Sequence, residues 1–147
     1  MLHLNDKVAI VTGAAMGMGK STAELFAKAG AKVIVADYNV EQGQAAADEI
    51  KANGGEATFI KVDVSIEEEV KNLVEKTVET YGRLDVAVNN AAITPDDKPI
   101  AEMDMDYYER LMAVDLKGVM LCMKYEIKQM LAQGSPGSIV NTSSVSG

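Results

Sequence analysis

The sequence has one cysteine, one histidine and no tryptophan among its 147 residues. Because Cys122 is alone, an internal disulfide cannot form, which fits a reducing compartment. We expect no zinc site, since His3 and Cys122 lie far apart and neither residue type occurs again. A serine–histidine–aspartate triad would have to use His3, close to a loosely held chain end, and we reject it.

Positive charge is also in short supply. Fourteen Lys and Arg residues stand against 22 Asp and Glu residues, which gives a formal net charge of −8 and an isoelectric point near 4.6. Nucleic acids and anionic membranes attract basic surfaces, so neither is an expected partner. No apolar run reaches membrane-spanning length, and residues 1–6 lack the basic and apolar segments of a secretory signal. We therefore expect about one domain, located in the cytoplasm.

A glycine-rich segment, T-G-A-A-M-G-M-G at residues 12–19, lies between an apolar strand-like run and a segment with apolar residues at helical spacing. Such a turn aims free backbone N–H groups and the positive end of a helix at one point, where a pyrophosphate can bind. Gly13 would allow the sharp turn, Gly17 the approach of phosphate oxygens, and Gly19 close packing of helix on strand. Taken alone the segment also fits an ordinary tight loop, because its G-x-x-x-G-x-G pattern differs from G-x-G-x-x-G.

Asp37 makes the nucleotide-binding interpretation more specific. It ends a second apolar run, eighteen positions after Gly19. An acidic residue about 20 positions past the glycine turn is placed to accept hydrogen bonds from a ribose hydroxyl. A carboxylate there repels a 2′-phosphate, and residues 38–44 contain no Lys or Arg, so NAD(H) is favoured over NADP(H). In isolation, a turn residue after a strand would be the better interpretation of Asp37.

Strand and helix signals alternate along the chain, which predicts an α/β fold with a doubly wound parallel sheet. We expect strands at 8–12, 32–37, 57–62, 85–89 and 138–142, and helices at 17–29, 40–53, 66–81 and 107–133. Residues 1–147 would form a single dinucleotide-binding domain. Residues 65–68, S-I-E-E, read as a capping box that opens the third helix. The irregular segment 90–105 is either a ligand-facing loop or a solvated connector.

Further motifs follow the glycine turn in a fixed order. They are V-D-V-S at 62–65, L-D-V-A-V-N-N-A-A at 84–92, V-D-L-K-G-V at 114–119 and G-S-I-V-N-T-S-S-V-S-G at 137–147. Together they resemble the amino-terminal portion of the short-chain dehydrogenase/reductase family over the whole chain. The resemblance implies a Rossmann-like sheet, truncated after its fifth strand relative to the family. It also implies hydride transfer between NAD(H) and a secondary alcohol or ketone, in a homodimer or homotetramer formed through the helix at 107–133.

The resemblance also assigns residues to the cofactor. Gly13, Met16, Gly17, Met18 and Gly19 match the pyrophosphate turn, Asp37 the adenosine-ribose acceptor, Asp63 and Val64 the adenine pair, and Asn90 and Ala91 the strand end beside the cofactor ribose. The strand pattern agrees, because Asp63 and Asn90 would end strands at the same rim as Asp37. Both also have plainer interpretations, Asp63 as a polar strand end and Asn90 as a backbone cap of a turn.

Two catalytic residues follow from the same resemblance. Ser144 matches the serine that hydrogen-bonds the substrate oxygen and stabilises developing charge there, without acting as a nucleophile. The V-x-G at residues 145–147 selects Ser144 over Ser143. Asp115 occupies the position of the family's catalytic asparagine, which holds a proton-relay water. An ionised aspartate can accept from that water but cannot donate to it.

The family's general base, a tyrosine followed four residues later by a lysine, does not occur in this sequence. The lysine is needed because an unperturbed phenol, with a pKa of about 10, is a poor base at neutral pH. Tyr125 with Lys128 is the nearest substitute, and we expect both to be structural. Three interpretations remain: an NAD-dependent enzyme whose base lies beyond Gly147, a non-catalytic dinucleotide-binding module, or an inactive fragment that does not fold.

Overall fold

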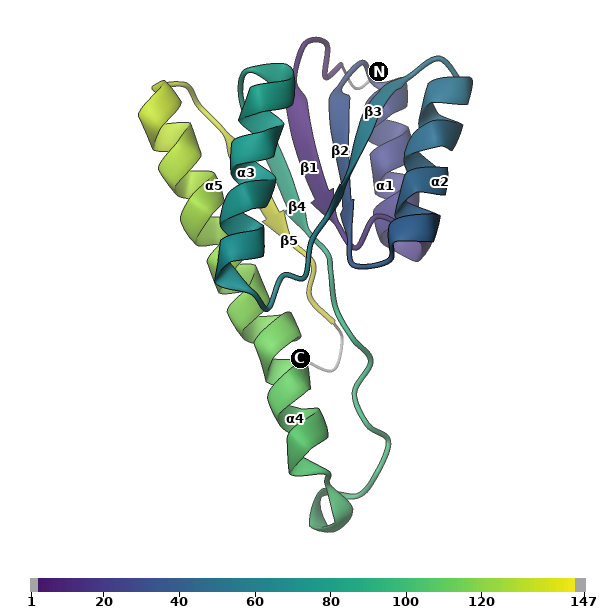
Figure 1. Cartoon of the computed structure of the whole chain (residues 1–147), viewed down its shortest axis with the longest axis vertical. Coiled ribbons are helices and arrows are strands. Elements are labelled where there is room, and N and C mark those ends of the chain that lie inside the picture. The colour runs from purple at the N-terminus through teal and green to yellow at the C-terminus, as the bar shows by residue number, and fades with distance from the viewer. Residues whose placement is uncertain (1–2, 145–147) are drawn as a thin grey trace.

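The apolar runs of the sequence form the five strands of one parallel sheet (Figure 1). The structure, a computed structural model, describes residues 3–144. The strands are β1 (Val8–Thr12), β2 (Lys32–Asp37), β3 (Glu56–Lys61), β4 (Val86–Asn89) and β5 (Ser138–Asn141), in the spatial order β3-β2-β1-β4-β5. The strand order therefore reverses between β1 and β4. In sheets of this kind, ligands bind in the crevice outside the carboxyl ends of such a pair.

Helices cover both faces of the sheet (Figure 1). The long helices are α1 (Gly17–Lys28), α2 (Val40–Ala52), α3 (Glu67–Tyr81) and α5 (Val119–Gln133). Successive residues of a strand point to opposite faces, so Val11 joins an apolar core with Ala23 of α1, whereas Ile10 joins another with Leu73 of α3. The predicted doubly wound, Rossmann-like α/β fold is confirmed.

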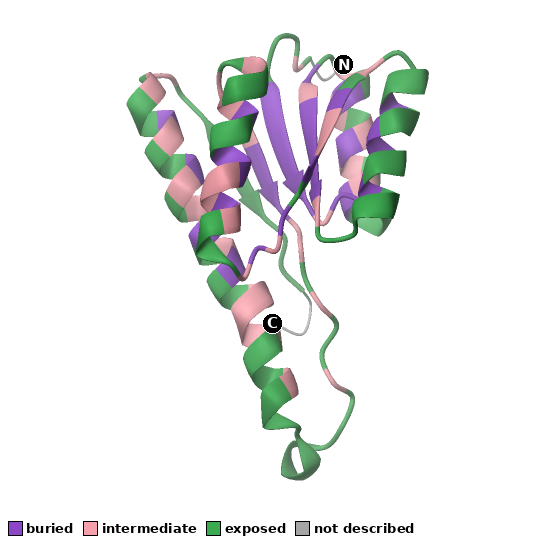
Figure 2. Cartoon of the chain, viewed as in Figure 1, coloured by how far each residue is buried: buried purple, intermediate pink, exposed green. Residues whose placement is uncertain are grey.

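The central strand β1 is buried along its whole length (Figure 2). Strands covered on both faces are typically such continuous apolar runs. Each large aliphatic side chain buried in this way contributes about 1.5–3 kcal/mol to folding. Two helices are followed by a glycine in the left-handed conformation: Gly54 after α2 has φ 85°, and Gly82 after α3 has φ 82°. These left-handed positions suit glycine because it has no side chain to clash.

The single helix expected at 107–133 is wrong in two respects. The helical segment begins earlier, with α4 (Met105–Met112), because the Asp104 side chain caps it by accepting from the backbone N–H of Asp106 at 3.0 Å. A π-helical segment, η2 (Ala113–Gly118), then separates α4 from α5. Such wide turns are common at functional sites and are not signalled by apolar spacing.

The capping box is also wrong. α3 begins at Glu67, and the Ser65 hydroxyl donates to Asp63 Oδ1 at 2.6 Å instead of capping the helix. A charged acceptor makes the stronger hydrogen bond, which explains the choice. The strands β3, β4 and β5 each differ from the expected bounds by one residue at one or both ends.

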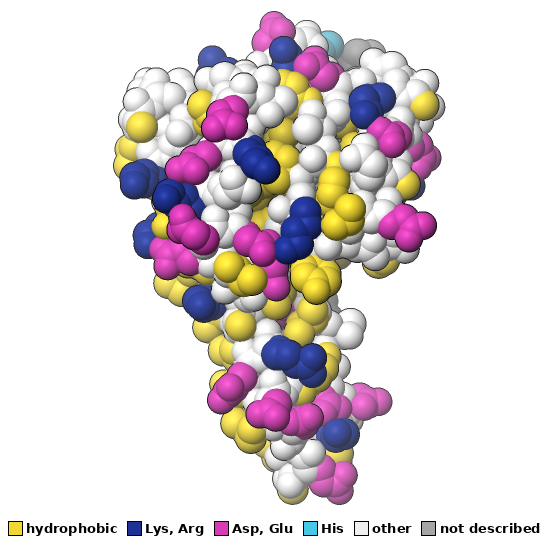
Figure 3. All heavy atoms as spheres, in the orientation of Figure 1, with side chains coloured by type: hydrophobic (Ala, Val, Ile, Leu, Met, Phe, Trp, Pro, Cys, Tyr) yellow, Lys and Arg dark blue, Asp and Glu magenta, His cyan; other side chains and the backbone are white. Residues whose placement is uncertain are grey.

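Residues 94–112, which we call the arm, extend beyond the carboxyl edge of the sheet (Figures 1 and 2). The arm contains the 3-10 helix η1 (Ile100–Glu102) and α4, whose residues are all exposed or half-buried. Ile100 is 85% exposed. Asp and Glu side chains gather on the arm in the space-filling view (Figure 3). Among residues 3–144, no helix is long and apolar enough to cross a membrane.

Candidate functional site

The glycine turn joins the end of β1 to the first turn of α1. Gly13 has φ +65°, and a Cβ there would lie 2.9 Å from the Cα of Ala91, so a side chain is excluded on two grounds. At Gly19, a Cβ would overlap the carbonyl oxygen of Gly13. Within the described chain, the first turn of α1 carries neither an acidic residue nor a side-chain cap. Its N–H groups and the positive helix end are therefore available to an anion.

Met16, Gly17 and Met18 form the exposed part of this turn. The side chains of Met16 and Met18 are 58% and 70% exposed. Exposed methionines beside open backbone N–H groups make a flexible apolar border for a ligand, because the thioether chain adapts its shape.

Asp37 fixes the glycine turn to the end of β2. Its Oδ2 accepts from the backbone N–H of Ala15 at 2.9 Å, and its Oδ1 accepts from the backbone N–H of Asn39, also at 2.9 Å. A carboxylate offers about four acceptor positions, so both oxygens keep capacity for a ribose hydroxyl. The local bond to Asn39 is also the turn role that the sequence left open.

Asp63 and Val64 follow β3 at the same rim. Asp63 Oδ1 accepts from both the backbone N–H and the hydroxyl of Ser65, at 3.0 and 2.6 Å. Its own backbone N–H donates to Glu69 Oε2 at 2.7 Å. Val64 is buried in the core under α3. The segment is therefore held rigidly in position before any ligand binds.

Asn90 and Ala91 are tied to β1 through one hydroxyl. Thr12 Oγ1 accepts from the backbone N–H groups of Asn90 and Ala91, at 3.0 and 3.1 Å. The Asn90 amide donates to the carbonyl oxygens of Thr12 and Gly13, at 3.3 and 3.4 Å. These bonds join β1 and β4 at the point where the strand order reverses.

A pocket of about 380 Å³ opens at this rim. It is lined by Gly13, Met16, Asp37, Tyr38, Val62, Asp63, Val64, Asn90, Ala91, Ala92, Ile93 and Val114. Seven of the ten predicted cofactor residues therefore meet in one cavity; Gly17, Met18 and Gly19 lie outside its lining. The volume is within the range of small-molecule and cofactor sites, roughly 300–1,000 Å³.

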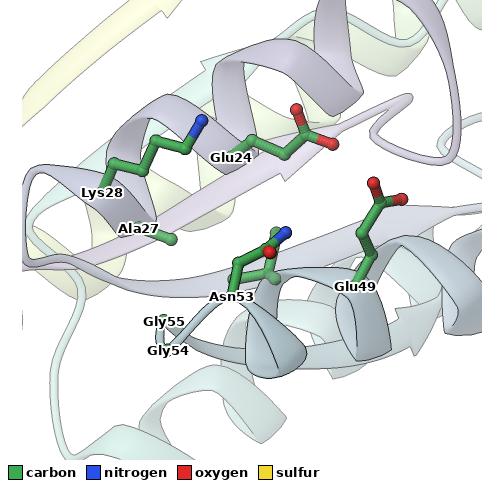
Figure 4. A pocket seen from close by; sticks show the side chains of 8 residues that line it. Glu24, Ala27, Lys28, Glu49, Asn53, Gly54 and Gly55 are labelled. Carbon is green, nitrogen blue, oxygen red and sulfur yellow. The ribbon is translucent and has the colours of Figure 1, made fainter.

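A second cavity, of about 390 Å³, lies between α1 and the end of α2 (Figure 4). Its walls include Glu24 and Lys28 from α1, Glu49 from α2, and Asn53, which caps the end of α2. It is remote from the carboxyl ends of the strands, and no predicted site residue lines it. Among residues 3–144, no three His, Cys, Asp or Glu side chains are grouped to hold a metal ion.

The two predicted catalytic residues lie outside the pocket lining. Ser144 follows β5 and is exposed, while the V-x-G that selected it lies at residues 145–147, outside the described residues. Asp115 belongs to η2, and its Oδ1 accepts from the backbone N–H of Ile93 at 2.9 Å. This contact gives Asp115 a positioning role, because it fixes the loop that leaves β4.

A tyrosine that acts as a general base needs surroundings that lower its pKa, and the surroundings of Tyr125 raise it. Its hydroxyl donates to Glu67 Oε1 at 2.9 Å, and Lys124 contacts the same oxygen at 2.6 Å. The pKa of Tyr125 is raised, chiefly because its phenol is hydrogen-bonded to the Glu67 carboxylate. These contacts tie α5 to α3.

Glu126 is a buried carboxylate that was not predicted as a site residue from the sequence. It is 1% exposed in the structure. It accepts from the Asn89 amide at 3.0 Å, and that amide also donates to Asn141 Oδ1 at 3.0 Å. Burial raises the pKa of Glu126 to about 7. Asn89 Oδ1 is buried without a partner among residues 3–144. The available signal was a carboxylate in the buried stripe Cys122, Glu126, Met130, where helical spacing predicts apolar residues.

Comparisons with known proteins agree with this geometry. A model of the short chain dehydrogenase family matches residues 7–147. The short chain dehydrogenase/reductase astE of Aspergillus oryzae is 49% identical over 142 residues, which are 96% of this chain and 54% of that protein. A 2,5-dichloro-2,5-cyclohexadiene-1,4-diol dehydrogenase of Sphingobium indicum is 44% identical over 147 residues, covering 100% of this chain and 58% of that protein.

A solved structure agrees as well. The crystal structure of a short-chain type dehydrogenase/reductase from Mycobacterium marinum superposes with a TM-score of 0.95 at 34% identity, covering 99% of this chain and 59% of the other. The chain therefore spans little more than half the length of these relatives, and its sheet is truncated relative to theirs.

Proposed function

The chain belongs to the short chain dehydrogenase family, and from that premise we propose that it is the dinucleotide-binding part of an NAD(H)-dependent oxidoreductase. The reaction would transfer a hydride between the nicotinamide and a secondary alcohol or ketone. One observation carries the proposal: the 380 Å³ pocket gathers the glycine turn, Asp37, Asp63 and Asn90 at the carboxyl ends of four neighbouring strands. That is the place and the polarity that a dinucleotide requires.

The residues present fit a nicotinamide dinucleotide. The uncapped first turn of α1 offers N–H donors to a pyrophosphate, and the close contact at Gly13 leaves room for backbone but not for a side chain. Asp37 keeps acceptor capacity for the adenosine ribose, and Asp63 and Val64 border the adenine side of the pocket. The Asp37 carboxylate also repels a 2′-phosphate, which supports NAD(H) as the cofactor over NADP(H).

The catalytic roles are proposals for the complete protein. When bound, NAD(H) supplies or accepts the hydride. Ser144 would hydrogen-bond the substrate oxygen, holding it in line and stabilising the charge that develops on it. Asp115 would keep the loop after β4 in place through the N–H of Ile93. The proton of the substrate hydroxyl needs a base, and this sequence contains no tyrosine with a lysine four residues later.

A relative supports the proposed substrate class. The Sphingobium relative is named for a cyclic diol whose hydroxyls are secondary, which supports a secondary alcohol or its ketone as the substrate here.

A dinucleotide-binding module without turnover is the second candidate function. The one phenol and amine close to the required spacing, Tyr125 and Lys128, do not form a base, because the Tyr125 hydroxyl is hydrogen-bonded to Glu67.

We propose a homodimer or homotetramer associated through α5, in the cytoplasm. The side chains of Leu116, Met120, Ile127 and Leu131 are between 46% and 76% exposed, and their spacing places them along one side of the η2–α5 helical rod. Size-exclusion chromatography with light scattering tests the proposed association. A monomeric mass at micromolar concentration would contradict it.

The function is tested by titrating the chain with NADH and following its fluorescence, then adding a cyclic secondary alcohol with NAD⁺. We expect saturable binding of NADH and no turnover by the 147-residue chain. A chain that is folded by circular dichroism but binds no NADH would contradict the proposal. Turnover by this chain would contradict the requirement for a tyrosine–lysine base.

A further inference from the structure

A lysine lies beside the residue proposed to accept the adenosine ribose. Lys61 ends β3, and its register partner on the adjacent strand is Asp37. The Lys61 ammonium lies 5.4 Å from the centroid of the Tyr38 ring, and Tyr38 lines the nucleotide pocket. The stretch of sequence that follows Asp37 contains no cation, so only the pairing of β2 with β3 reveals this one. A cation in this position would ordinarily favour a 2′-phosphate.

Glu69 forms an ion pair with the Lys61 ammonium. Lys61 Nζ donates to Glu69 Oε1 at 2.9 Å and to Oε2 at 2.8 Å. Oε2 also accepts from the backbone N–H of Asp63, so the carboxylate is fixed from two sides. The pKa of Glu69 is lowered, first by the Lys61 hydrogen bond and then by the Asp63 N–H, and the pKa of Lys61 is raised by Glu69. Both groups are ionised at neutral pH.

Resting on the proposed function, we infer that Glu69 is a specificity-determining residue, because it holds Lys61 in an ion pair next to Tyr38 and Asp63, which line the pocket, and withholds that charge from a 2′-phosphate. With Glu69 in place, the pocket lining carries the carboxylates of Asp37 and Asp63, and the ion pair beside it adds one carboxylate and one ammonium. A dianionic phosphate therefore meets net repulsion. Without the charge of Glu69, the ammonium beside the pocket is free.

A purely structural role accounts poorly for the pair. The side chains of Lys61 and Glu69 are 42% and 30% exposed, and exposed ion pairs contribute little to stability. The structural contribution of Glu69 is the hydrogen bond that its carboxylate accepts from the Asp63 N–H. The side-chain oxygen of a glutamine can accept the same bond. Glu69→Gln therefore removes the charge while preserving the bond that shapes the rim.

The test uses nucleotides that carry only the adenosine half, 5′-AMP and 2′,5′-ADP, titrated into the chain by calorimetry at low ionic strength. In Glu69→Gln, we expect the preference for 5′-AMP over 2′,5′-ADP to fall about fivefold, the effect of one charge at close range in water. Glu68→Gln is the matched control, because Glu68 lies in the same helical turn and pairs with Lys71 at 3.1 Å, away from the pocket. The preference of Glu68→Gln for 5′-AMP over 2′,5′-ADP should equal that of the wild type.

Lys61→Met provides an independent test. It leaves the carboxylates without their counter-charge, so the preference for 5′-AMP over 2′,5′-ADP should rise about fivefold. The double variant Glu69→Gln/Lys61→Met should lose the gain in 2′,5′-ADP binding. Unchanged preference in both single variants, or a gain that survives in the double variant, would overturn the inference while 5′-AMP still binds. If the folded wild type bound neither 5′-AMP nor NADH, the proposed function would fail and the inference with it.

Discussion

The carboxyl rim of the sheet has two sides that differ in how firmly their polar groups are held. On the side of β1, β2 and β3, Asp37 is hydrogen-bonded to the glycine turn and Asp63 to Ser65, and Asn90, which follows β4, is hydrogen-bonded to Thr12 of β1. On the side of β5, the strand is exposed or half-buried, with Val140 52% exposed. The arm beyond it is also open to solvent (Figure 2).

The side proposed to bind the nucleotide is thus assembled by contacts within this chain, whereas the side proposed to bind the substrate exposes apolar surface that is not covered by residues 3–144. An uncovered strand edge invites association with other chains, which is the reason the sequence also suggested a fragment that does not fold. The two sides should therefore separate in experiment: changes on the β5 side should affect turnover, and changes on the β1–β3 side should affect nucleotide binding.

Ser144 gives the largest expected effect and the sharpest form of this comparison. In the complete protein, Ser144→Ala should lower kcat by about 100-fold or more, since it removes a donor to the developing oxyanion. The Kd for NADH should not change, because Ser144 does not line the nucleotide pocket. Steady-state kinetics and NADH titration on the same preparation measure both. Ser143→Ala is the matched control, and near-normal turnover in Ser144→Ala would remove Ser144 from the mechanism.

Glu126 connects the two sides, and its effect should appear as a pH dependence of stability. Burial raises its pKa to about 7 in the folded state, above the usual value of about 4.3 in an unfolded chain. The folded state thus binds the proton more tightly. The associated stability is complete below about pH 4.3 and is lost as the pH rises through about 7. Denaturant unfolding should show a loss of about 2–3 kcal/mol over this range.

Glu126→Gln separates this loss from the titration of other carboxyls. The variant keeps an acceptor for the Asn89 amide but cannot ionise. Wild type and variant should unfold with similar free energies near pH 4, and the variant should be the more stable one above pH 7. A difference that does not vary with pH would show that the folded-state pKa of Glu126 is not raised.

Gly19 tests how rigid the nucleotide side is. A Cβ at this position overlaps the carbonyl oxygen of Gly13, so Gly19→Ala must displace backbone and should cost about 2 kcal/mol of unfolding free energy, with weaker NADH binding. At Gly54, φ is +85° and a Cβ meets nothing within 4 Å, so Gly54→Ala should cost about 1 kcal/mol and leave NADH binding unchanged. Equal effects in the two variants would argue against close packing at Gly19.

The sequence predicted the glycine turn and the end of β2 better than the rest of the pocket surroundings for a physical reason. Glycine turns and strand ends depend on neighbouring residues, so Gly13 and Asp37 could be interpreted locally. The Lys61–Glu69 pair depends on which helix packs on which strand, and no local pattern carries that information. For Glu126, the helical spacing marks a carboxylate in a buried stripe, but it does not reveal the partner, Asn89 on β4.

The errors have two different origins. Ser65 was expected to cap α3 but donates to the carboxylate of Asp63, two residues before it, so one local hydrogen bond replaced another. The break between α4 and α5 accompanies the contact of Asp115 with the loop after β4, which lies twenty-two residues earlier in the chain. A helix that is continuous in apolar spacing can thus be interrupted by a tertiary hydrogen bond.

Asp37 gives the smallest expected effect and addresses the choice of cofactor directly. Asp37→Ala removes the acceptor for the ribose and the repulsion of a 2′-phosphate, so NADH should bind about tenfold more weakly while discrimination against NADPH is relaxed. Asp48→Ala is the control for net charge, because Asp48 is paired with Lys51 on α2 and does not line the pocket. Asp37→Asn then divides the two contributions, since it keeps one acceptor oxygen and loses the charge. Unchanged affinity of Asp37→Ala for both dinucleotides would show that Asp37 acts only through Ala15 and Asn39, as a structural clamp on the turn.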